Sequence, residues 1–326
     1  MMKTRIVGTG QYLPEEILTN VDLETRVDTT DEWIRQRTGI IQRHVAPPGT
    51  GTSEVAIPAC QRALEAAGIE AAEVDLIVCC TCTPDHIFPS TACLIQHGLG
   101  AERAAAIDLN AACTGFVYGL TVADAMLKTG VYKTAIVVGA EVLSNHLNWE
   151  RRDTAILFGD GAGAVVLRAE EGDKGILSCH LRADGGAKEL LFMQAGGSKE
   201  HVTAENVNSP SRDIVMNGRE LFKKAVVLFA EAAQRVLDDT GYKADDLDLF
   251  VPHQANTRII FSATERAGIA AEKVFINIDL VANTVGASIP IALDDAMQQG
   301  RLKDGDLVML AAFGAGLTWG ASLLRW

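Results

Sequence analysis

The chain has 326 residues, 48% of them hydrophobic and 22% charged, so it is a folded globular protein with one large or two smaller domains and not a disordered one. Its net charge of −13 disfavours a nucleic-acid binder or an anionic-membrane binder, because both partners require a positive field. Seven cysteines without paired spacing, and an N-terminus without an apolar signal core, indicate a reducing, cytoplasmic location.

The first half of the chain predicts an alternation of helices and strands. The strands are continuously apolar, as expected when helices cover both faces of a parallel sheet. In chain order we expect a helix over 53–67, strands over 74–81 and 104–109, a helix over 113–128, and strands over 134–139 and 164–168.

The second half predicts the same alternation after a polar, glycine-rich segment, 171–215, which we expect to form a hairpin and a surface excursion. The uncharged run 307–324 approaches the length of a membrane span, but its glycines favour a buried strand–turn–strand hairpin. The expected elements are a helix over 219–240, strands over 247–251 and 274–280, a helix over 288–299 and a strand over 306–312.

An internal repeat supports a division into two fused halves, 1–170 and 171–326. Two blocks of residues recur in the same order at nearly one offset, which is far longer than a solenoid period and therefore indicates duplication. Gln61, Arg62, Leu64 and Gly68 recur as Gln234, Arg235, Leu237 and Gly241 (234 − 61 = 173), and Ile107-Asp108-Leu109 recurs as Ile278-Asp279-Leu280 (278 − 107 = 171).

Cys113 is the candidate nucleophile. It follows an expected strand and begins an expected helix, and a helix N-terminus favours a thiolate by lowering the pKa of the thiol. The alternative is a buried, unreactive cysteine, which is how we interpret the other six. Cys79, Cys80 and Cys82 lie on one strand without a second pair of ligands, so we expect no metal site.

His253 and Asn283 are the candidate partners of Cys113. His253 follows an apolar strand, and Asn283 follows Ile278-Asp279-Leu280, so the repeat makes Asn283 the expected counterpart of Cys113 (283 − 113 = 170). A helix N-cap is the alternative role for Asn283. Two chemistries remain open for this set: a protease-like arrangement in which His253 activates the thiol, or two donors that stabilise a developing enolate oxygen.

Seven motifs together resemble the β-ketoacyl-[acyl-carrier-protein] synthase III family of the thiolase superfamily, over essentially the whole chain. That family has two pseudo-twofold-related halves stacked as five layers, αβαβα, so the resemblance implies a thiolase-like α/β fold. The motifs are DEWIRQRTGI (31–40), FPSTAC (88–93), AACTGF (111–116), ILFGDGAGAVVL (156–167), VPHQAN (251–256), ANTVGASIP (282–290) and AFGAGLTWG (312–320).

The resemblance implies a decarboxylative condensation that initiates fatty-acid synthesis. Cys113 would take an acyl group from acyl-CoA, and His253 and Asn283 would hold the enolate left when malonyl-carrier protein loses CO2. The backbone N–H groups of Cys113 and Ala315 would hold the tetrahedral oxyanion. No metal or other cofactor is implied, because the thioester is itself the electron sink.

The resemblance also implies the binding residues and partners: acyl-CoA, acyl carrier protein and a second copy of the chain. Trp33 and Arg37 would sandwich the adenine of CoA. Phe88 would close the acyl pocket of the partner in a homodimer, and Phe313 would neighbour the catalytic histidine. Thr38, Arg152, Met216, Gly218, Phe222, Ala255 and Asn256 would line the pantetheine tunnel, and Lys223, Lys224, Arg258 and Arg266 would dock the carrier protein.

Four residues depart from the family pattern. Ala282 and Ala315 stand where glycine is usual, and Asp153 follows Arg152 where glycine is usual, which places a carboxylate near the CoA phosphates. Glu265 precedes Arg266 and thins the expected docking patch.

Two alternatives to this function remain open. One is a related condensing enzyme of specialised metabolism, with a different primer or extender. The other is a non-catalytic protein that binds acyl-CoA, which the presence of Cys113, His253 and Asn283 together argues against.

Overall fold

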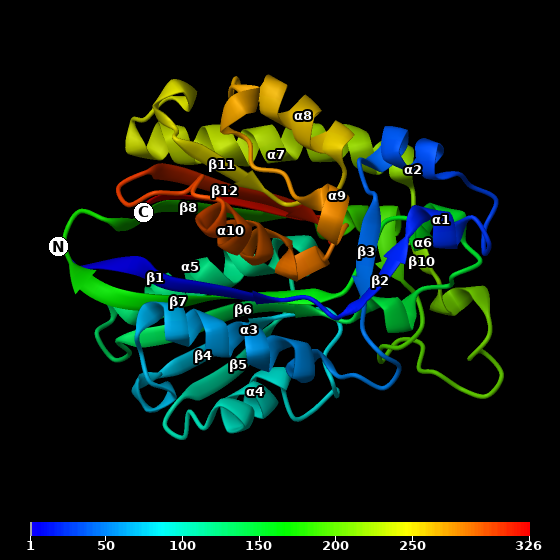
Figure 1. The fold of residues 1–326 in the computed structure, drawn as a ribbon, viewed down its shortest axis with the longest axis horizontal. Helices are drawn as coiled ribbons and strands as arrows, with labels where there is room; N and C mark the ends of the chain where they lie inside the picture. Colours follow the sequence, from blue (N-terminus) through cyan, green and yellow to red (C-terminus); the bar gives the residue numbers. More distant parts are fainter. Residues whose placement is uncertain (1) are drawn as a thin grey trace.

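The computed structural model describes residues 2–326, which form two central sheets covered and separated by helices (Figure 1). The first sheet has the strand order β1-β7-β6-β4-β5, in which β4 is parallel to β5 and β6, while β7 is antiparallel to β6 and β1. Its strands are β1 (Met2–Tyr12), β4 (Leu76–Cys80), β5 (Ala105–Leu109), β6 (Thr134–Glu141) and β7 (Gly161–Glu171).

The second sheet repeats these strand directions. Its order is β11-β12-β13-β8, with β11 parallel to β12 and the remaining neighbours antiparallel. Hence β8, β13, β12 and β11 correspond to β1, β7, β6 and β4. The strands are β8 (Gly175–Ala183), β11 (Leu249–Pro252), β12 (Leu307–Gly314) and β13 (Thr318–Arg325).

Helices form three layers around the sheets, which gives the expected five-layer thiolase-like order. The period of two along each strand explains this, because alternate side chains face opposite layers. Leu76 and Val78 pack in the central core with the middle helices, while Ile77 packs with the outer ones. The outer helices are α3 (Thr52–Ala67) and α4 (Thr91–Leu99) on one side and α7 (Gly218–Thr240) and α8 (Thr257–Arg266) on the other; α5 (Gly115–Lys128) and α10 (Ser288–Gln298) lie between the sheets.

Two expectations about the sheets were wrong. Both sheets are mixed, not parallel, because each half ends in a strand, β7 or β13, that runs antiparallel to its neighbours. The segment 274–280 is not a strand: a single parallel bridge joins Val274 to Phe250, at the place that β5 occupies beside β4, and α9 (Ile278–Val281) follows directly. Among residues 2–326, the second sheet therefore has no strand equivalent to β5.

The run 307–324 forms the expected hairpin of β12 and β13, and no helix within residues 2–326 is long and apolar enough to cross a membrane. Each strand of the hairpin is almost entirely buried. Burial within the sheet accounts for this uncharged sequence.

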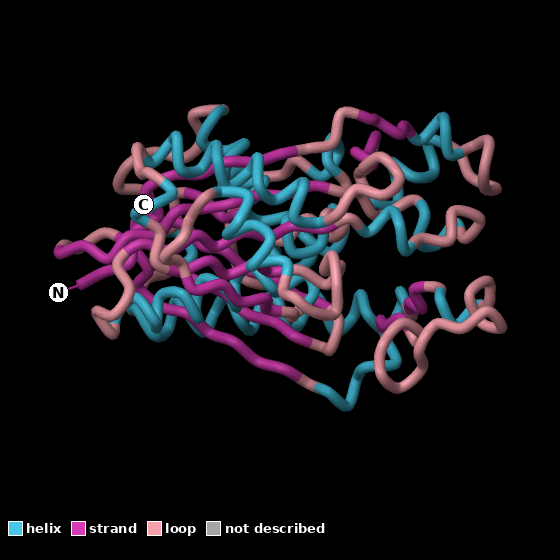
Figure 2. Tube along the Cα trace, turned by 90° about the horizontal axis from the view of Figure 1, so that it is seen from below, coloured by secondary structure: helices cyan, strands magenta, loops and turns pink. Residues whose placement is uncertain are grey.

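Short elements gather at the end of the molecule opposite the two termini (Figures 1 and 2). They connect the layers and surround the carboxyl ends of the parallel strands, where α/β proteins place their ligand sites. These elements are β2 (Glu16–Thr19), α1 (Asn20–Leu23), α2 (Asp31–Thr38), β3 (Gln42–Val45), α6 (Arg152–Ala155), β9 (Leu191–Met193) and β10 (Ile214–Met216).

Candidate active site

Cys113 lies in a tight turn between β5 and α5. The turn is a 3-10 helix, Ala112–Thr114, and begins with Ala112 in the left-handed region at φ 48°. The Asn110 side chain accepts a hydrogen bond from the Ala112 N–H at 3.2 Å and so closes the turn. Cys113 is buried and faces the apolar side chains of Phe158 and Val285.

The second half contains the same turn, which corrects the expected correspondence between Asn283 and Cys113. The 3-10 helix Val285–Ala287 begins with Val285 at φ 51°, and the Asn283 Oδ1 accepts from the Val285 N–H at 2.9 Å. Asn283 therefore corresponds to Asn110 (283 − 110 = 173), and Gly286 corresponds to Cys113 (286 − 113 = 173). The offset of 171 gave the wrong counterpart because the second half has two extra residues between Leu280 and this turn.

Asn283 is held by its backbone against the 157–159 segment. Its N–H donates to the Leu157 carbonyl at 3.0 Å, and its carbonyl accepts from the Gly159 N–H at 3.1 Å. The hydrogen bond that Oδ1 accepts from the Val285 N–H fixes the orientation of the Asn283 side chain. Within residues 2–326, its Nδ2 donates to no protein acceptor. The free amide N–H group is available to a ligand.

His253 follows β11 and is anchored through its backbone. Its N–H donates to the Ala311 carbonyl of β12 at 2.8 Å. The residue is 2% exposed, and both ring nitrogens lack a hydrogen-bond partner among residues 2–326. Burial lowers the pKa of His253 to about 3, because desolvation disfavours the imidazolium. The ring is therefore neutral at physiological pH, with one N–H to donate.

The expected lowering of the Cys113 pKa was wrong. Burial, followed by the nearby Glu141 carboxylate, raises the pKa of Cys113 to about 12. The thiol also lies in the 3-10 turn two residues before α5 begins, so desolvation outweighs the helix N-terminus. Cys113 is a protonated thiol in the unliganded protein.

Cys113, His253 and Asn283 line one cavity of about 600 Å³. The cavity runs from these three residues past apolar walls to a mouth with cationic side chains. Of the remaining residues expected to bind ligands, those in its lining are Trp33, Arg37, Thr38, Met216, Gly218, Phe222, Lys223, Ala255, Asn256, Arg258 and Phe313. The lining residues that the sequence did not single out are Arg219, Ile156, Leu157, Phe158, Leu191, Leu221, Ile259 and Gly314, most of which carry only an ordinary apolar signal.

Five expected residues lie outside that lining: Arg152, Ala315, Phe88, Lys224 and Arg266. Arg152 is nevertheless at the mouth, because its guanidinium lies 4.8 Å from the centre of the Trp33 ring. Phe88 is 83% exposed.

The Trp33 ring is flanked by two guanidinium groups. Arg152 lies 4.8 Å from its centroid and Arg37 lies 5.6 Å from it. Arg152 also donates to the Asp28 carbonyl at 2.9 Å. Asp153 lines the mouth, but Arg151 pairs with it at 3.1 Å and with Asp213 at 3.2 Å. Arg151 thus offsets the carboxylate that the sequence placed near the CoA phosphates.

The backbone around Cys113 provides two free N–H groups. Those of Cys113 and Ala315 donate to no protein acceptor within the described residues. Gly314 is close to the first of them, since a Cβ built on Gly314 would lie 2.9 Å from the Cys113 nitrogen. A side chain at 314 would therefore crowd the Cys113 backbone nitrogen.

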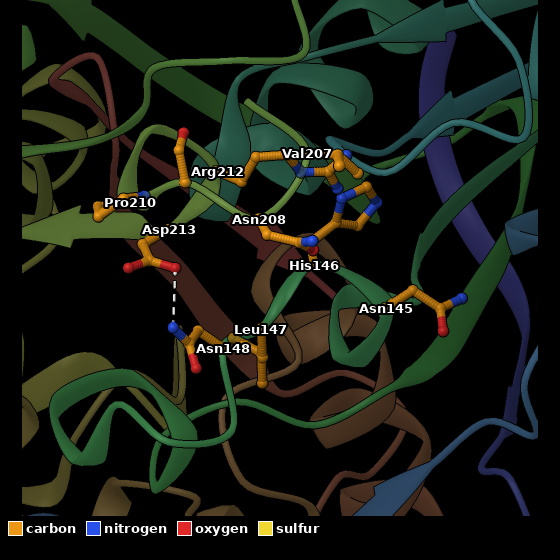
Figure 3. Close-up of a pocket in the computed structure, with 10 residues that line it drawn as sticks. Asn145, His146, Leu147, Asn148, Val207, Asn208, Pro210, Arg212 and Asp213 are labelled. Atoms are coloured by element: carbon orange, nitrogen blue, oxygen red, sulfur yellow. Dashed lines mark hydrogen bonds between the residues drawn. The ribbon is translucent and has the colours of Figure 1, made fainter. Parts of the chain in front are cut away.

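A second cavity, of about 440 Å³, lies between the 145–148 turn and the 207–213 loop (Figure 3). It is lined by polar side chains such as His146 and Arg212, and it contains none of Cys113, His253 and Asn283. No cluster of three possible metal ligands exists within residues 2–326.

Comparison with known proteins identifies the class of this fold and site. A family model described as 3-oxoacyl-[acyl-carrier-protein (ACP)] synthase III matches residues 107–185, and a model of its C-terminal part matches residues 237–326. The solved structure of 3-oxoacyl-[acyl-carrier-protein] synthase III from Aquifex aeolicus superposes with a TM-score of 0.92 at 46% identity, covering 99% of this chain and 100% of the other. The chain is thus a thiolase-fold condensing enzyme, an acyltransferase.

Relatives define the family more narrowly. The synthase III from Pseudomonas aeruginosa matches with a TM-score of 0.92 at 42% identity, covering 99% of this chain and 98% of the other. The β-ketoacyl-[acyl-carrier-protein] synthase III of Desulfitobacterium hafniense is 50% identical over 326 residues, covering 100% of this chain and 98% of that protein. This chain belongs to the β-ketoacyl-[acyl-carrier-protein] synthase III family, as the motifs predicted.

Proposed function

We propose that the chain condenses an acyl-CoA primer with malonyl-acyl-carrier protein through an acyl-Cys113 intermediate, in the cytoplasm. The observation that carries the proposal is the shared cavity, because a thiol, a neutral imidazole and an amide N–H group from opposite halves of the chain meet at its closed end. Relatives over the full length are named for this synthase activity.

The first step is transfer of the acyl group to Cys113. The sulfur attacks the thioester carbonyl, the Cys113 proton passes to the departing CoA sulfur, and one C–S bond replaces another. The negative oxygen of the tetrahedral intermediate accepts from the N–H groups of Cys113 and Ala315, which protein acceptors leave free. The high pKa of Cys113 requires the proton to leave as the thioester is attacked.

The second step forms the new carbon–carbon bond. The malonyl C–CO2 bond breaks, its electron pair forms the thioester enolate, and the enolate oxygen accepts from the His253 N–H and the Asn283 Nδ2. The enolate carbon then attacks the acyl carbonyl, and Cys113 leaves as a thiolate, which takes a proton from solvent. A neutral His253 suits this role because it donates at any pH well above 3. No metal or other cofactor is needed, since the thioester accepts the electrons.

The protease-like arrangement has less support. A His253 with a pKa near 3 is a weak base toward a thiol with a pKa near 12. In addition, Asn283 Oδ1 caps its own turn through Val285, so it does not orient an imidazole.

The mouth of the cavity fits CoA and then the carrier protein. Trp33 offers a flat face to adenine with Arg152 and Arg37 beside it, so we assign Arg152 to adenine stacking together with the expected Arg37. Lys223 and Arg258 line the mouth and suit an acidic carrier. Lys224 and Arg266 remain expected docking residues beside them.

A homodimer completes the proposed assembly. Ile87 and Phe88 are 92% and 83% exposed on the loop that leads to α4, and β5 is an edge strand with an exposed Ile107. Such an apolar edge suits a second copy of the chain. In this arrangement Phe88 would close the partner's acyl pocket.

The experiment that tests the function is a panel of acyl-CoAs from acetyl to decanoyl, each with malonyl-carrier protein or malonyl-CoA. CO2 release and product mass are measured for each pair. A β-ketoacyl-carrier product, absent with the Cys113→Ala variant, is the expected result. Product with malonyl-CoA alone would instead identify a condensing enzyme of specialised metabolism. Binding without an acyl adduct would overturn catalysis.

A further inference from the structure

Glu141, the last residue of β6, is a buried carboxylate that the proposed reaction does not use. It accepts hydrogen bonds from the Cys82 N–H at 3.1 Å and the Thr83 hydroxyl at 2.7 Å. The Cys82 thiol and the Thr81 hydroxyl each donate to it at 3.3 Å. These donors replace the water that an ionised carboxylate loses on burial, and they fix the 81–83 turn to the end of β6.

The carboxylate lies where the 81–83 turn meets the two catalytic turns. A Cβ on Gly286, in the turn after Asn283, would lie 3.2 Å from Glu141 Oε1 and 3.6 Å from the carbonyl oxygen of Ala112. Cys82, which Glu141 holds, packs against the apolar cluster that contains Cys113. One side chain therefore contacts or adjoins the turns from both halves.

The repeat explains this position. Glu141 corresponds to Gly314 (314 − 141 = 173), and Cys113 corresponds to Gly286 (286 − 113 = 173). In the active site, Gly314 leaves the Cys113 backbone nitrogen uncrowded. At the equivalent place in the other half, the Glu141 carboxylate lies 3.2 Å from where a Cβ on Gly286 would stand. The strand end that carries no side chain in one half thus carries a carboxylate in the other.

We propose that Glu141 is a positioning residue, which holds the 81–83 turn against the Cys113 turn and whose negative charge adds to burial in disfavouring the Cys113 thiolate. The proposal rests on the proposed role of Cys113 as the nucleophile.

The electrostatics around Cys113 support this role. Burial raises the pKa of Glu141 to about 7, so the carboxylate titrates within the physiological range. After burial, Glu141 is the charged group that raises the pKa of Cys113. Above pH 7 the carboxylate is ionised and opposes the thiolate, and below pH 7 it is protonated and does not.

Four other titratable groups come from elements packed around Cys113. Burial raises the pKa of the Cys80 and Cys82 thiols, which are uncharged, and His253 is neutral. Asp108 on β5 accepts from the backbone N–H groups at the start of α4, at 2.7 and 2.8 Å. The Val285–Ala287 turn, β12 and the first three residues of α5 bring no titratable side chain.

The test is the rate of Cys113 alkylation by iodoacetamide between pH 5.5 and 9.5, with the modified residue mapped by mass spectrometry. For the unaltered enzyme we expect an inflection near pH 7 in the logarithm of the rate, as Glu141 ionises. Glu141→Gln should remove the inflection. Cys113 in this variant should also react about tenfold faster than in the unaltered enzyme at pH 9, which corresponds to a Cys113 pKa lower by roughly 1 unit. Below pH 6 the two rates should be equal.

Matched variants separate charge from structure. Glu141→Asp retains the charge and should retain the inflection. Asp160→Asn removes another buried carboxylate, which accepts hydrogen bonds from the backbone N–H groups of Ala46 and Ser144. This variant should leave the pH profile of Cys113 alkylation unchanged. A smooth profile for the unaltered enzyme, or the same shift in Asp160→Asn, would overturn the proposal. An acyl adduct that survives Cys113→Ala would overturn the proposed function and leave the alkylation result standing.

Discussion

Gly314 lies against the backbone of Cys113 so closely that a Cβ on Gly314 would be 2.9 Å from the Cys113 nitrogen. The two residues belong to different halves of the duplicated chain, with Gly314 ending β12 and Cys113 preceding α5. The space beside the Cys113 nitrogen thus exists because β12 of the other half carries no side chain at 314. The proposed oxyanion site is a product of the interface between the halves.

A methyl group at 314 should therefore disable acyl loading. We expect Gly314→Ala to lower the rate of acyl transfer to Cys113 by about 10²–10³-fold, the loss typical when one oxyanion donor is blocked. Stopped-flow release of CoA from acyl-CoA measures this rate. Gly185→Ala, where a Cβ meets no atom within 4 Å, is the control and should load normally. Normal loading by Gly314→Ala would contradict the assigned oxyanion site.

Ala282 is strained by the turn that carries Asn283. It adopts φ 57° and ψ −160°, a region that essentially only glycine occupies without cost. We expect Ala282→Gly to stabilise the protein by about 1 kcal/mol, measured as a rise of about 1–3 °C in Tm. Ala287, at φ −79° and ψ −14°, is relaxed, so Ala287→Gly should lower Tm instead. A lower Tm for Ala282→Gly would contradict the strain.

The low pKa of His253 predicts an unusual pH dependence of decarboxylation. A histidine with a pKa near 6.5 would become a charged imidazolium as pH falls from 7 to 5. His253, with a pKa of about 3, stays neutral across that range. With the acyl-enzyme formed beforehand, CO2 release should not fall between pH 7 and 5. A sigmoidal loss centred near pH 6.5 would show that the imidazole titrates normally.

The cationic mouth predicts selective effects on the carrier protein. Lys223 and Arg258 lie at the mouth, with Arg258 placed 5.8 Å from the Phe222 ring centre. Replacing both with Glu should raise the KM for malonyl-carrier protein about tenfold or more, because like charges would then oppose an acidic partner. Loading from acyl-CoA is the internal reference. Arg235→Glu, three turns further along α7, is the control; a KM unchanged by the double variant would refute docking at this mouth.

The sequence predicted most of the catalytic arrangement because strand ends in a duplicated α/β fold converge. Cys113 follows the half-exposed edge strand β5 and His253 follows the buried strand β11, and the loops after these two strands bring both residues to one cavity. The motifs extended this to the cavity lining, including Trp33 and Phe313.

Burial and close packing were not predictable from residue order. Helix position predicted a low pKa for Cys113, but the desolvation that raises it depends on residues brought from both halves. Likewise, 274–280 has the apolar pattern of a strand, yet the chain bends into α9 after a single bridge at Val274. Glu141 carried no signal, because a single acidic residue at a strand end is ordinary until its partners are seen.

The most direct test is whether acyl loading depends on Cys113 alone while decarboxylation depends on His253 and Asn283. Intact-protein mass after incubation with acyl-CoA reports the acyl-Cys113 adduct, and CO2 release from malonyl-carrier protein reports the second step. We predict that His253→Ala and Asn283→Ala form the adduct but release CO2 at least about 10²-fold more slowly, while Cys113→Ala forms no adduct. Variants of His253 and Asn283 that fail to load, yet still decarboxylate, would contradict the assignment of these residues as enolate donors.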